Sequence, residues 1–487
     1  MVATRFKMAA SALLIAATGT AVARHVVHAP VVLRTAPRLP QTQAVFSGYV
    51  AAKKIPGVVG VIGRGNAPFA VVAAGRIGDE PGAPLADKDS LWRVYSMTKP
   101  ITAMAAMILI EEGKMRLDQP VSDFIPAFKT MRVQVSPDSL DTRAATRPIT
   151  IRNLLTHTAG LGYTIITKGP LLKAYEDAGI TPFTSDAKTE AQLRLKRPPT
   201  LEAFANKVAT LPLIAEPGTK WSYSIGLDVM GRVIEVASHQ PFDRFLQTRI
   251  FTPLKMRSSW FTVPGSEAHR LATGYFITPN GRTPVDPGAT SVYLKAPSFP
   301  YGGAGLVTSA YDYDRFLHML QNGGTLDGVR ILKPATVKLA MSNLLPNGVV
   351  YPGAVAATGG TTNPQGFGAG GSVTLHDTPG GPAKGTYAGA ALPARSPGSI
   401  RSISSARRSW STICRAIAGR CAPIRPRRSM PTSLRCCHTS ERGGDADTRL
   451  YRRPARPRRC AAPRRSRARR CPERLARAAA QARKFRA

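Results

Sequence analysis

The arrangement of hydrophobic and polar positions predicts a helix followed by a β-hairpin in the first part of the chain. Apolar residues follow a helical period over residues 42–54, and Pro56 and Gly57 end that helix. Two β-rich runs come next, over residues 58–63 and 69–74, with turn-forming residues between them. This pattern predicts an antiparallel hairpin.

A second helix is predicted from a run of apolar residues that leaves no polar face. Residues 101–110 are apolar on every side, and Glu111, Glu112 and Gly113 close the run. A helix of this kind is buried all round, and a glycine directly after it is well suited to end it. We therefore expect a buried central helix with Gly113 at its C-terminal end.

The rest of the pattern completes an α/β fold. Helical spacing recurs over residues 201–211, 227–238, 241–251 and 310–321, and residues 366–375 indicate a returning strand. Strands at both ends with helices between them predict an antiparallel sheet that is flanked by helices and carries a large helical insertion.

Charge divides the 487-residue chain into two unlike parts. The chain has 67 Lys and Arg against 29 Asp and Glu, and the net charge of +38 at first suggests a polyanionic partner. However, residues 388–487 alone hold 26 Arg, one Lys and only four acidic residues. This segment also contains all six cysteines: Cys414, Cys421, Cys436, Cys437, Cys460 and Cys471.

The first residues have the pattern of an export signal. Arg5 and Lys7 precede an apolar run over residues 8–23, and Ala21 and Ala23 form an A-x-A cleavage site. We therefore expect a signal peptide at 1–23, a linker at 24–41 and a periplasmic or secreted protein; the alternative is a short N-terminal helix. No run of 18 apolar residues predicts a membrane span.

The candidate chemistry lies at the start of the predicted central helix. Ser96 and Lys99 form an S-x-x-K tetrad, and their spacing places both side chains on one helical face. A serine hydroxyl needs a base, and a lysine can serve when burial lowers its pKa. Ser185 and Lys188 repeat the tetrad in a polar helix, where the lysine would stay protonated. Context favours Ser96 as a nucleophile, the alternative being a simple N-cap.

A phenol completes the predicted site. The segment 217–224, PGTKWSYS, forms a turn before the predicted helix at 227–238 and contains Tyr223. Beside Ser96, this phenol would share the serine proton with Lys99 and pass it to a leaving group. The alternative is a core tyrosine without a chemical role.

At this point the sequence resembles the serine β-lactamase and penicillin-binding superfamily, above all class C β-lactamases and family VIII carboxylesterases. The resemblance spans residues 42–387 and is carried by WRVYSMTKP at 92–100, LLTHTAGL at 154–161, PGTKWSYSIGLDVMGRVIE at 217–235 and GGAGLVTSAYDYDRFL at 302–317. It implies a β-lactamase/transpeptidase-like domain in which Ser96 is acylated and Lys99 and Tyr223 act as base and acid. It implies no cofactor and no metal.

The resemblance implies an exported serine hydrolase that acts on a small-molecule ester or β-lactam. Class C β-lactamases usually have Asn two residues after the tyrosine, and Ile225 in that place favours esters. A non-catalytic penicillin- or peptidoglycan-binding relative and a D-aminopeptidase remain alternatives, and the oligomeric state stays open. His157 is interpreted as structural because no G-x-S-x-G motif accompanies it, and residues 302–305 as a tight turn.

The segment 388–487 departs from the family pattern. The family has a third motif, K-T-G, H-x-G or W-x-G, on a strand facing the serine, and this segment has none. Abundant Arg, Ala, Pro, Ser and Cys are typical of a GC-rich gene read out of frame. The alternatives are an arginine-rich arm that binds nucleic acid or lipid and a small disulfide module. We favour an out-of-frame, disordered tail and no nucleic-acid partner, and we expect the C-terminal strands to be missing.

The frameshift hypothesis makes a prediction about the gene. If one base is missing after Tyr387, permitted codons for residues 388–401 restore GWGGAAGTIAWIDP, which contains the expected W-G-G. Sequencing should then reveal the missing base, and the chain as it stands should be inactive or poorly folded. An intact base count, or ordinary enzyme rates with p-nitrophenyl butyrate, would contradict this.

Overall fold

The computed structural model describes residues 39–64, 66–278, 281–352, 365–377, 382–391, 402–407 and 410–412. The predicted signal peptide lies outside the described residues, as do most of the predicted linker and most of the segment 388–487 with its six cysteines. In the described segments, no helix has the length and apolar character that a bilayer crossing requires.

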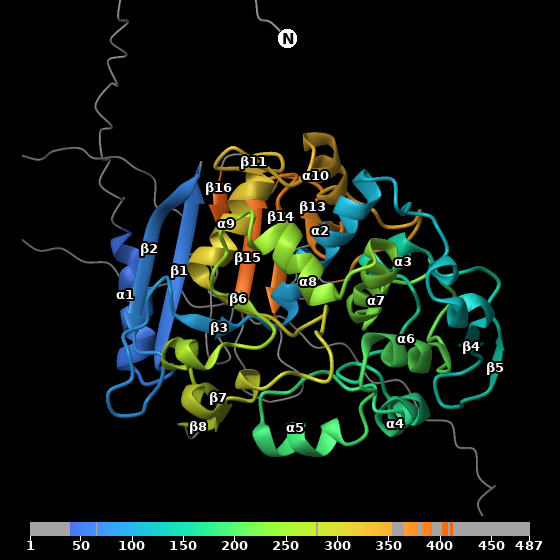
Figure 1. The fold of residues 1–487 in the computed structure, drawn as a ribbon, viewed down its shortest axis with the longest axis horizontal. Coiled ribbons are helices and arrows are strands. Elements are labelled where there is room, and N and C mark those ends of the chain that lie inside the picture. Colours follow the sequence, from blue (N-terminus) through green and yellow to red (C-terminus); the bar gives the residue numbers. More distant parts are fainter. Residues whose placement is uncertain are drawn as a thin grey trace, which may run out of the picture. The chain divides into compact units, whose positions relative to one another are not determined.

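The main sheet is antiparallel and joins the two ends of the described chain. Its described strands run in the order β12-β13-β14-β15-β16-β1-β2. They are β1 (Gly57–Arg64), β2 (Ala67–Gly75), β12 (Gln365–Phe367), β13 (Ser372–Thr374), β14 (Tyr387–Ala391), β15 (Ser402–Arg407) and β16 (Trp410–Thr412). The pair β1–β2 confirms the predicted hairpin, with Val61 opposite Val71 and a bulge after Ile62. Figure 1 shows the first and last strands in one layer.

The sheet continues past Tyr387, where the sequence analysis expected its strands to be missing. β14 pairs with β15 over five residue pairs, and β15 pairs with β16, which in turn pairs with β1. An antiparallel ladder is made by backbone N–H and C=O groups. Small and β-branched residues can therefore form it without the family's sequence. The reading frame of this segment stays a prediction.

Residues 366–375 form two strands where one returning strand was predicted. β12 and β13 make a tight hairpin, with Phe367 opposite Ser372. Gly370 in its turn has φ +74°, and a Cβ there would lie 2.8 Å from the carbonyl oxygen of Lys99. The cluster of glycines thus reverses the chain and allows the turn to pack directly against the central helix, which a continuous strand would not do.

The central helix has the predicted burial. α2 (Thr98–Glu111) has its first twelve residues buried, up to Leu109. Gly113 follows with φ +74°, which confirms it as the left-handed residue that ends the helix. α2 packs against α7 (Gly226–Ser238), and this contact joins the central helix to the helical insertion.

The remaining helices surround this pair. α1 (Pro40–Ala51) lies against β2, and α9 (Ala310–Gln321) lies against β1, β15 and β16. The insertion lies to the right of and below the sheet in Figure 1. Its helices are α3 (Ile151–Leu155), α4 (Gly169–Asp177), α5 (Ala187–Arg194), α6 (Leu201–Ala209), α7 and α8 (Phe242–Leu246), and α10 (Pro334–Ala340) follows α9. The predictions for 201–211, 227–238 and 310–321 are confirmed, whereas 241–251 divides into α8 and a π-helical turn, Gln247–Phe251.

Short strands complete the fold. β3 (Leu91–Arg93), β9 (Val307–Ser309) and β6 (Ser259–Trp260) form a small antiparallel sheet. Two-stranded ladders are made by β4 (Arg132–Gln134) with β5 (Thr142–Ala144), β7 (Gly274–Thr278) with β8 (Gly281–Asp286), and β10 (Thr325–Leu326) with β11 (Val329–Arg330). The predicted α/β architecture, an antiparallel sheet with flanking helices and a helical insertion, is confirmed.

Candidate active site

Ser96 lies in a single 3-10 turn between β3 and α2. The turn spans Tyr95–Met97, and Tyr95 has φ +42°, a left-handed conformation that costs a tyrosine about 1–3 kcal/mol. Two hydroxyls hold this backbone: Thr98 Oγ1 donates to the carbonyl of Tyr95 at 2.6 Å, and Tyr313 Oη donates to the carbonyl of Met97 at 3.0 Å. The local strain therefore persists because the surrounding core fixes it.

The structure brings the three predicted site residues together. Ser96 Oγ lies 2.5 Å from Tyr223 Oη, and Lys99 Nζ donates to Ser96 Oγ at 3.2 Å. Lys99 Nζ also lies 4.5 Å from the centre of the Tyr223 ring. Ser96 is 5% exposed and Lys99 is 2% exposed, so the amine is withdrawn from bulk water. Ser96 caps no helix with its side chain, since Met97 is the N-cap residue of α2.

A buried carboxyl supports the lysine through a glycine turn, and the sequence analysis missed it. Lys99 Nζ donates to the carbonyl of Gly303 at 2.7 Å, and Gly303 N–H donates to Asp228 Oδ1 at 2.8 Å. Burial raises the pKa of Asp228 to about 6, and the nearby Lys99 charge limits that rise. The only signal in the sequence was its position five residues after Tyr223. Residues 302–304 form the predicted tight turn, and it serves the lysine.

His157 packs against the Tyr223 ring, and its hydrogen bonds go to Ser224 and not to Ser96. Its Nδ1 pairs with Ser224 Oγ at 3.0 Å and accepts the Ser224 N–H at 3.2 Å. Its ring centre is 4.8 Å from that of Tyr223. Burial, and next the charge of Lys99, hold the pKa of His157 well below its ordinary value, so the ring is neutral. These contacts agree with the structural interpretation of His157.

A second tyrosine closes the site on the side of the insertion. The Tyr163 ring is 5.5 Å from the Tyr223 ring, and Lys99 Nζ is 5.6 Å from its centre. Burial raises the pKa of Tyr163 well above its ordinary value, with Asp228 and Tyr223 adding to the shift. Tyr163 therefore stays a neutral phenol beside the buried amine. Tyr163 was not selected from the sequence, although it lies only two residues after the LLTHTAGL motif.

The strand opposite the serine turn is present. β14 contacts the turn Tyr95–Met97, and this is where the family pattern places its third motif. Tyr387 begins β14 and donates from Oη to the carbonyl of Ala369 at 2.6 Å, which ties the strand to the glycine hairpin. Residues 388–391 read A-G-A-A, so the strand supplies backbone here without the W-x-G side chain.

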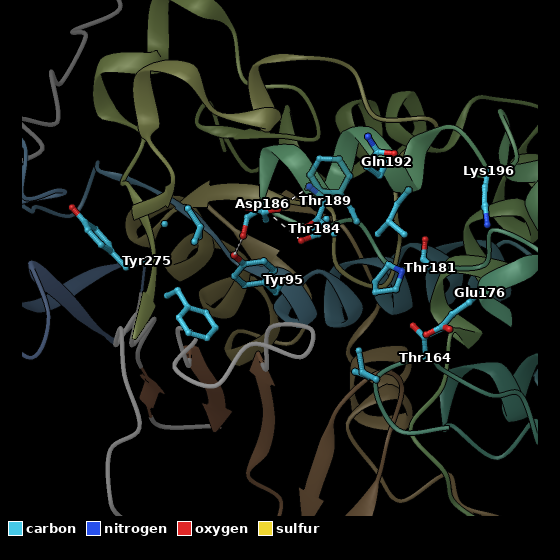
Figure 2. Close-up of a pocket in the computed structure, with 18 of the residues that line it drawn as sticks. Tyr95, Thr164, Glu176, Thr181, Thr184, Asp186, Thr189, Gln192, Lys196 and Tyr275 are labelled. Carbon is cyan, nitrogen blue, oxygen red and sulfur yellow. Dashed lines mark hydrogen bonds between the residues drawn. The ribbon is translucent and has the colours of Figure 1, made fainter. Parts of the chain in front are cut away.

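A cavity of about 820 Å³ adjoins this centre. Figure 2 shows it between α5, the end of α4 and the β7–β8 hairpin, with Tyr95 at its inner wall. Tyr95 Oη donates to Ser185 Oγ at 3.2 Å. Ser185 therefore belongs to the cavity wall, and Lys188 of the second S-x-x-K tetrad is exposed, as predicted. No cluster of three or more His, Cys, Asp or Glu that could hold a metal occurs in the described residues.

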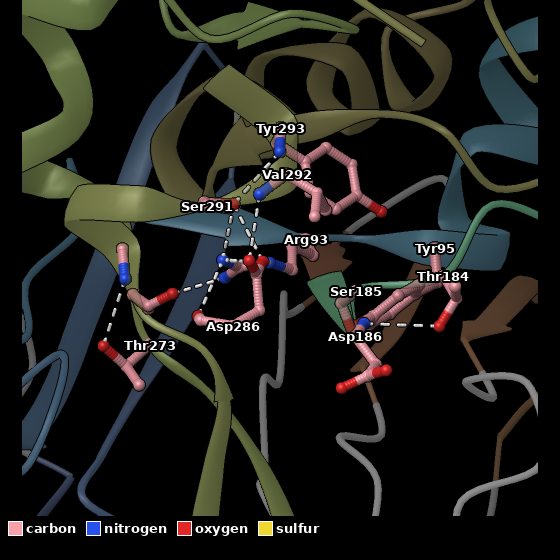
Figure 3. A network of polar contacts seen from close by, with 12 residues as sticks. Arg93, Tyr95, Thr184, Ser185, Asp186, Thr273, Asp286, Ser291, Val292 and Tyr293 are labelled. Carbon is pink, nitrogen blue, oxygen red and sulfur yellow. Dashed lines mark hydrogen bonds and ion pairs between the residues drawn. The ribbon is translucent and has the colours of Figure 1, made fainter. Parts of the chain in front are cut away.

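An ion pair anchors the strand that leads to Ser96. Arg93 on β3 donates from Nε to Asp286 Oδ2 at 2.6 Å, and both side chains are 1% exposed. Arg93 also donates to Ser291 Oγ at 2.9 Å, and Asp286 Oδ1 accepts the Val292 N–H at 3.0 Å (Figure 3). Because each charge has its hydrogen bonds satisfied, the pair fixes β3 against the end of the β7–β8 hairpin.

Comparison with known proteins identifies the family. The sequence pattern of the family described as Beta-lactamase matches residues 42–395, which is most of the chain. The chain belongs to this family. The resemblance to the serine β-lactamase and penicillin-binding superfamily is thereby confirmed, and this superfamily of serine hydrolases includes esterase and acyltransferase relatives of the chain.

Particular relatives give the same picture. Protein Rv1367c of Mycobacterium tuberculosis is 34% identical over 270 residues, covering 55% of this chain and 62% of that protein. The match thus spans less than two thirds of that relative. Esterase EstB of Burkholderia gladioli is 30% identical over 293 residues, covering 57% of this chain and 69% of the esterase. The solved structure titled "EstCE1, a hydrolase with promiscuous acyltransferase activity" aligns with TM-score 0.61 and 26% identity, covering 78% of this chain and 92% of that one.

Removing the buried guanidinium should destabilise the protein strongly. Arg93→Met leaves the Asp286 carboxylate buried without its cation, and the free energy of unfolding should fall by about 3–5 kcal/mol in urea titrations. Arg282→Met is the matched control. Arg282 lies on β8, like Asp286, but its pair with Asp79 is partly exposed and should contribute at most about 1 kcal/mol. Equal effects of the two substitutions would contradict the anchoring role.

The buried carboxyl predicts a pH-dependent stability. A carboxyl whose pKa is raised from 3.8 to about 6 gives stability that is complete below pH 3.8 and is lost as the pH rises through 6. Relative to Asp228→Asn, which does not titrate, the unmodified chain should lose about 3 kcal/mol of unfolding free energy between pH 4 and pH 7. Urea titrations at four pH values measure the difference. A constant difference would contradict a raised pKa at Asp228.

Proposed function

We propose that this chain carries a serine esterase site that forms an acyl-enzyme on Ser96. The observation that supports this most directly is the position of Ser96 Oγ, 2.5 Å from Tyr223 Oη and 3.2 Å from Lys99 Nζ. A hydroxyl within reach of two proton-transfer groups in a buried site is equipped for nucleophilic attack. We also keep the proposals that the protein is exported and that its last segment is out of frame.

The acylation step follows from this geometry. As Ser96 Oγ attacks the ester carbonyl carbon, its proton passes to the Lys99–Tyr223 pair, and the carbonyl oxygen takes the negative charge. When the tetrahedral intermediate collapses, the bond to the leaving alcohol breaks, and Tyr223 Oη returns the proton to the alcohol oxygen. Water repeats the sequence on the acyl-serine and releases the acid. General acid–base transfer of this kind contributes about 10²- to 10⁴-fold in rate.

The surrounding charges suit this sequence. Two hydrogen bonds, from Lys99 Nζ to the Gly303 carbonyl and from the Gly303 N–H to Asp228, hold the amine next to Ser96. α2 begins two residues after Ser96, and the positive end of its dipole favours charge developing on the substrate oxygen. The family pattern also implies that a backbone N–H of the facing strand, here β14, donates a hydrogen bond to the negatively charged oxygen of the substrate.

Esters are favoured over β-lactams at one position. Ile225 stands where class C β-lactamases usually hold an asparagine for the drug's amide, and its side chain is 3% exposed. A buried aliphatic side chain offers no hydrogen bond to an amide. The relative EstB is named as an esterase, which agrees with this choice.

Covalent labelling tests the proposed roles. A fluorophosphonate probe should attach to Ser96 of the purified chain, as seen by peptide mass spectrometry, and Ser96→Ala should abolish the label. Lys99→Met and Tyr223→Phe should each lower the labelling rate constant by about 10²- to 10⁴-fold. Lys188→Met, in the second tetrad, should leave it unchanged. Labelling at another residue, or an unchanged rate with Tyr223→Phe, would overturn the assignment.

Release of p-nitrophenol from p-nitrophenyl butyrate separates the esterase from a non-catalytic binding relative. Repeated turnover, however slow, supports a hydrolase, because each cycle must remove the acyl group from Ser96. A single burst equal to the enzyme concentration indicates acylation without hydrolysis. The assay runs for hours, so that slow turnover is also detected.

A further inference from the structure

We infer that the cavity in Figure 2 receives the larger, uncharged part of the ester, and that the loop over residues 179–197 determines its size. The inference rests on the esterase function proposed above and adds the substrate class. It assigns a positioning role to the buried Arg197–Glu190 pair, which lies outside the catalytic centre.

The cavity lies beside the nucleophile because two segments contribute to both. Tyr95 lines the cavity and directly precedes Ser96. Thr164 also lines it and directly follows Tyr163, whose ring is 5.5 Å from that of Tyr223. The cavity wall is therefore continuous along the chain with the turn that carries Ser96 and with the segment that carries Tyr163.

The lining suits a large apolar group. Apolar side chains contribute much of the wall: Ile165, Pro182, Phe183, Leu193, Phe276 and Val285. A volume of about 820 Å³ far exceeds what an acetyl group fills and falls in the range of pockets that hold drug-sized ligands. The free energy gained by burying apolar area there grows with the size of the substituent.

The charges at the rim disfavour anionic esters. Glu176, Asp177 and Asp186 line the cavity against a single cation, Lys196. A hydrogen bond from Lys173 lowers the pKa of Asp177, and one from Thr189 lowers the pKa of Asp186, so both are ionised at neutral pH. A carboxylate on the substrate would meet more acidic than basic side chains in the lining, and salt should weaken the repulsion.

The two ends of the loop over residues 179–197, which forms the outer wall, lie against each other. Gly179 has φ +69°, and a Cβ there would lie 2.0 Å from the carbonyl oxygen of Lys196. The two ends of the loop are therefore in direct backbone contact, and only glycine fits between them. Between these ends lie α5 and the cavity residues from Thr181 to Lys196.

A buried guanidinium holds the loop's interior. Arg197 donates to the carbonyl of Pro182 at 2.6 Å and to Thr181 Oγ1 at 3.2 Å, and it pairs with Glu190. The two charged side chains are 0% and 6% exposed. Glu190 also accepts the Thr184 N–H at 3.1 Å. One ion pair thus fixes both the backbone around Phe183 and helix α5, which together form the wall.

The wall is also tied to the catalytic turn. Ser185 on the loop accepts the hydroxyl proton of Tyr95, the residue that precedes the nucleophile. A rigid wall in fixed register with Ser96 selects substrates by size, whereas a loose wall would accept small and large groups alike.

Two fluorophosphonate probes test the inference on the full chain. One carries a methyl group and the other a phenethyl group on phosphorus, and the measured quantity is the ratio of their rate constants at Ser96. The unmodified chain should react about tenfold faster with the phenethyl probe. Ile165→Trp fills the cavity and should cut this ratio about tenfold. Ile166→Trp is the matched control, because Ile166 is 42% exposed and does not line the cavity.

Two further measurements test the role of the loop and the role of the charges. Glu190→Gln keeps the side-chain shape but removes the ion pair, and it should lower the phenethyl-to-methyl ratio while the methyl rate stays within about twofold. A probe ending in a carboxylate should react more slowly than the phenethyl probe. The difference between the two rate constants should shrink in about 0.5 M salt, because salt screens the repulsion between exposed charges.

The outcomes separate this inference from the proposed function. A chain that reacts at Ser96 with neither probe overturns the esterase proposal and the inference with it. Reaction at Ser96 with a ratio that Ile165→Trp and Ile166→Trp leave equal overturns the inference alone. A ratio that Glu190→Gln does not change overturns the role of the loop.

Discussion

The position of one buried amine constrains the rest of the site. Lys99 Nζ has little contact with water, and its hydrogen bonds go to the serine oxygen and to a carbonyl 204 residues further along the chain. A buried polar group without partners costs about 1–3 kcal/mol, and a charged one costs more. The helix that carries the amine, the glycine turn that receives it and the carboxyl behind that turn must therefore all be in place. Packing and chemical competence become one requirement.

Local patterns predicted the parts of the fold that obey local rules. The apolar run of α2, the helical spacing of α9 and the two β-rich runs of the β1–β2 hairpin are visible in the sequence, because local composition, spacing and turn residues determine each of them. The π-helical turn after α8 leaves no such trace. The hairpin β12–β13 was predicted as one strand, since nothing local shows that Gly370 must pass close to the backbone of Lys99.

The residues of the candidate site that belong to sequence motifs could be predicted. Those that act only through tertiary contacts could not. Ser96 and Lys99 share one helical face, and Tyr223 belongs to a segment that the family resemblance makes visible. Asp228 acts through a backbone N–H of Gly303, and Arg197 through carbonyls on its own loop. Contacts to backbone place no demand on the partner's side chain. Sequence alone therefore gives no pattern by which such a contact could be found.

The place of β1 in the sheet has a consequence for how the chain folds. One of its neighbours, β2, follows it immediately, but the other, β16, ends at Thr412. While the chain is being made, the early hairpin must exist with an open edge for some 350 residues of synthesis, and open edges pair readily with other chains. The order of strands thus makes completion of the main sheet a late event in synthesis.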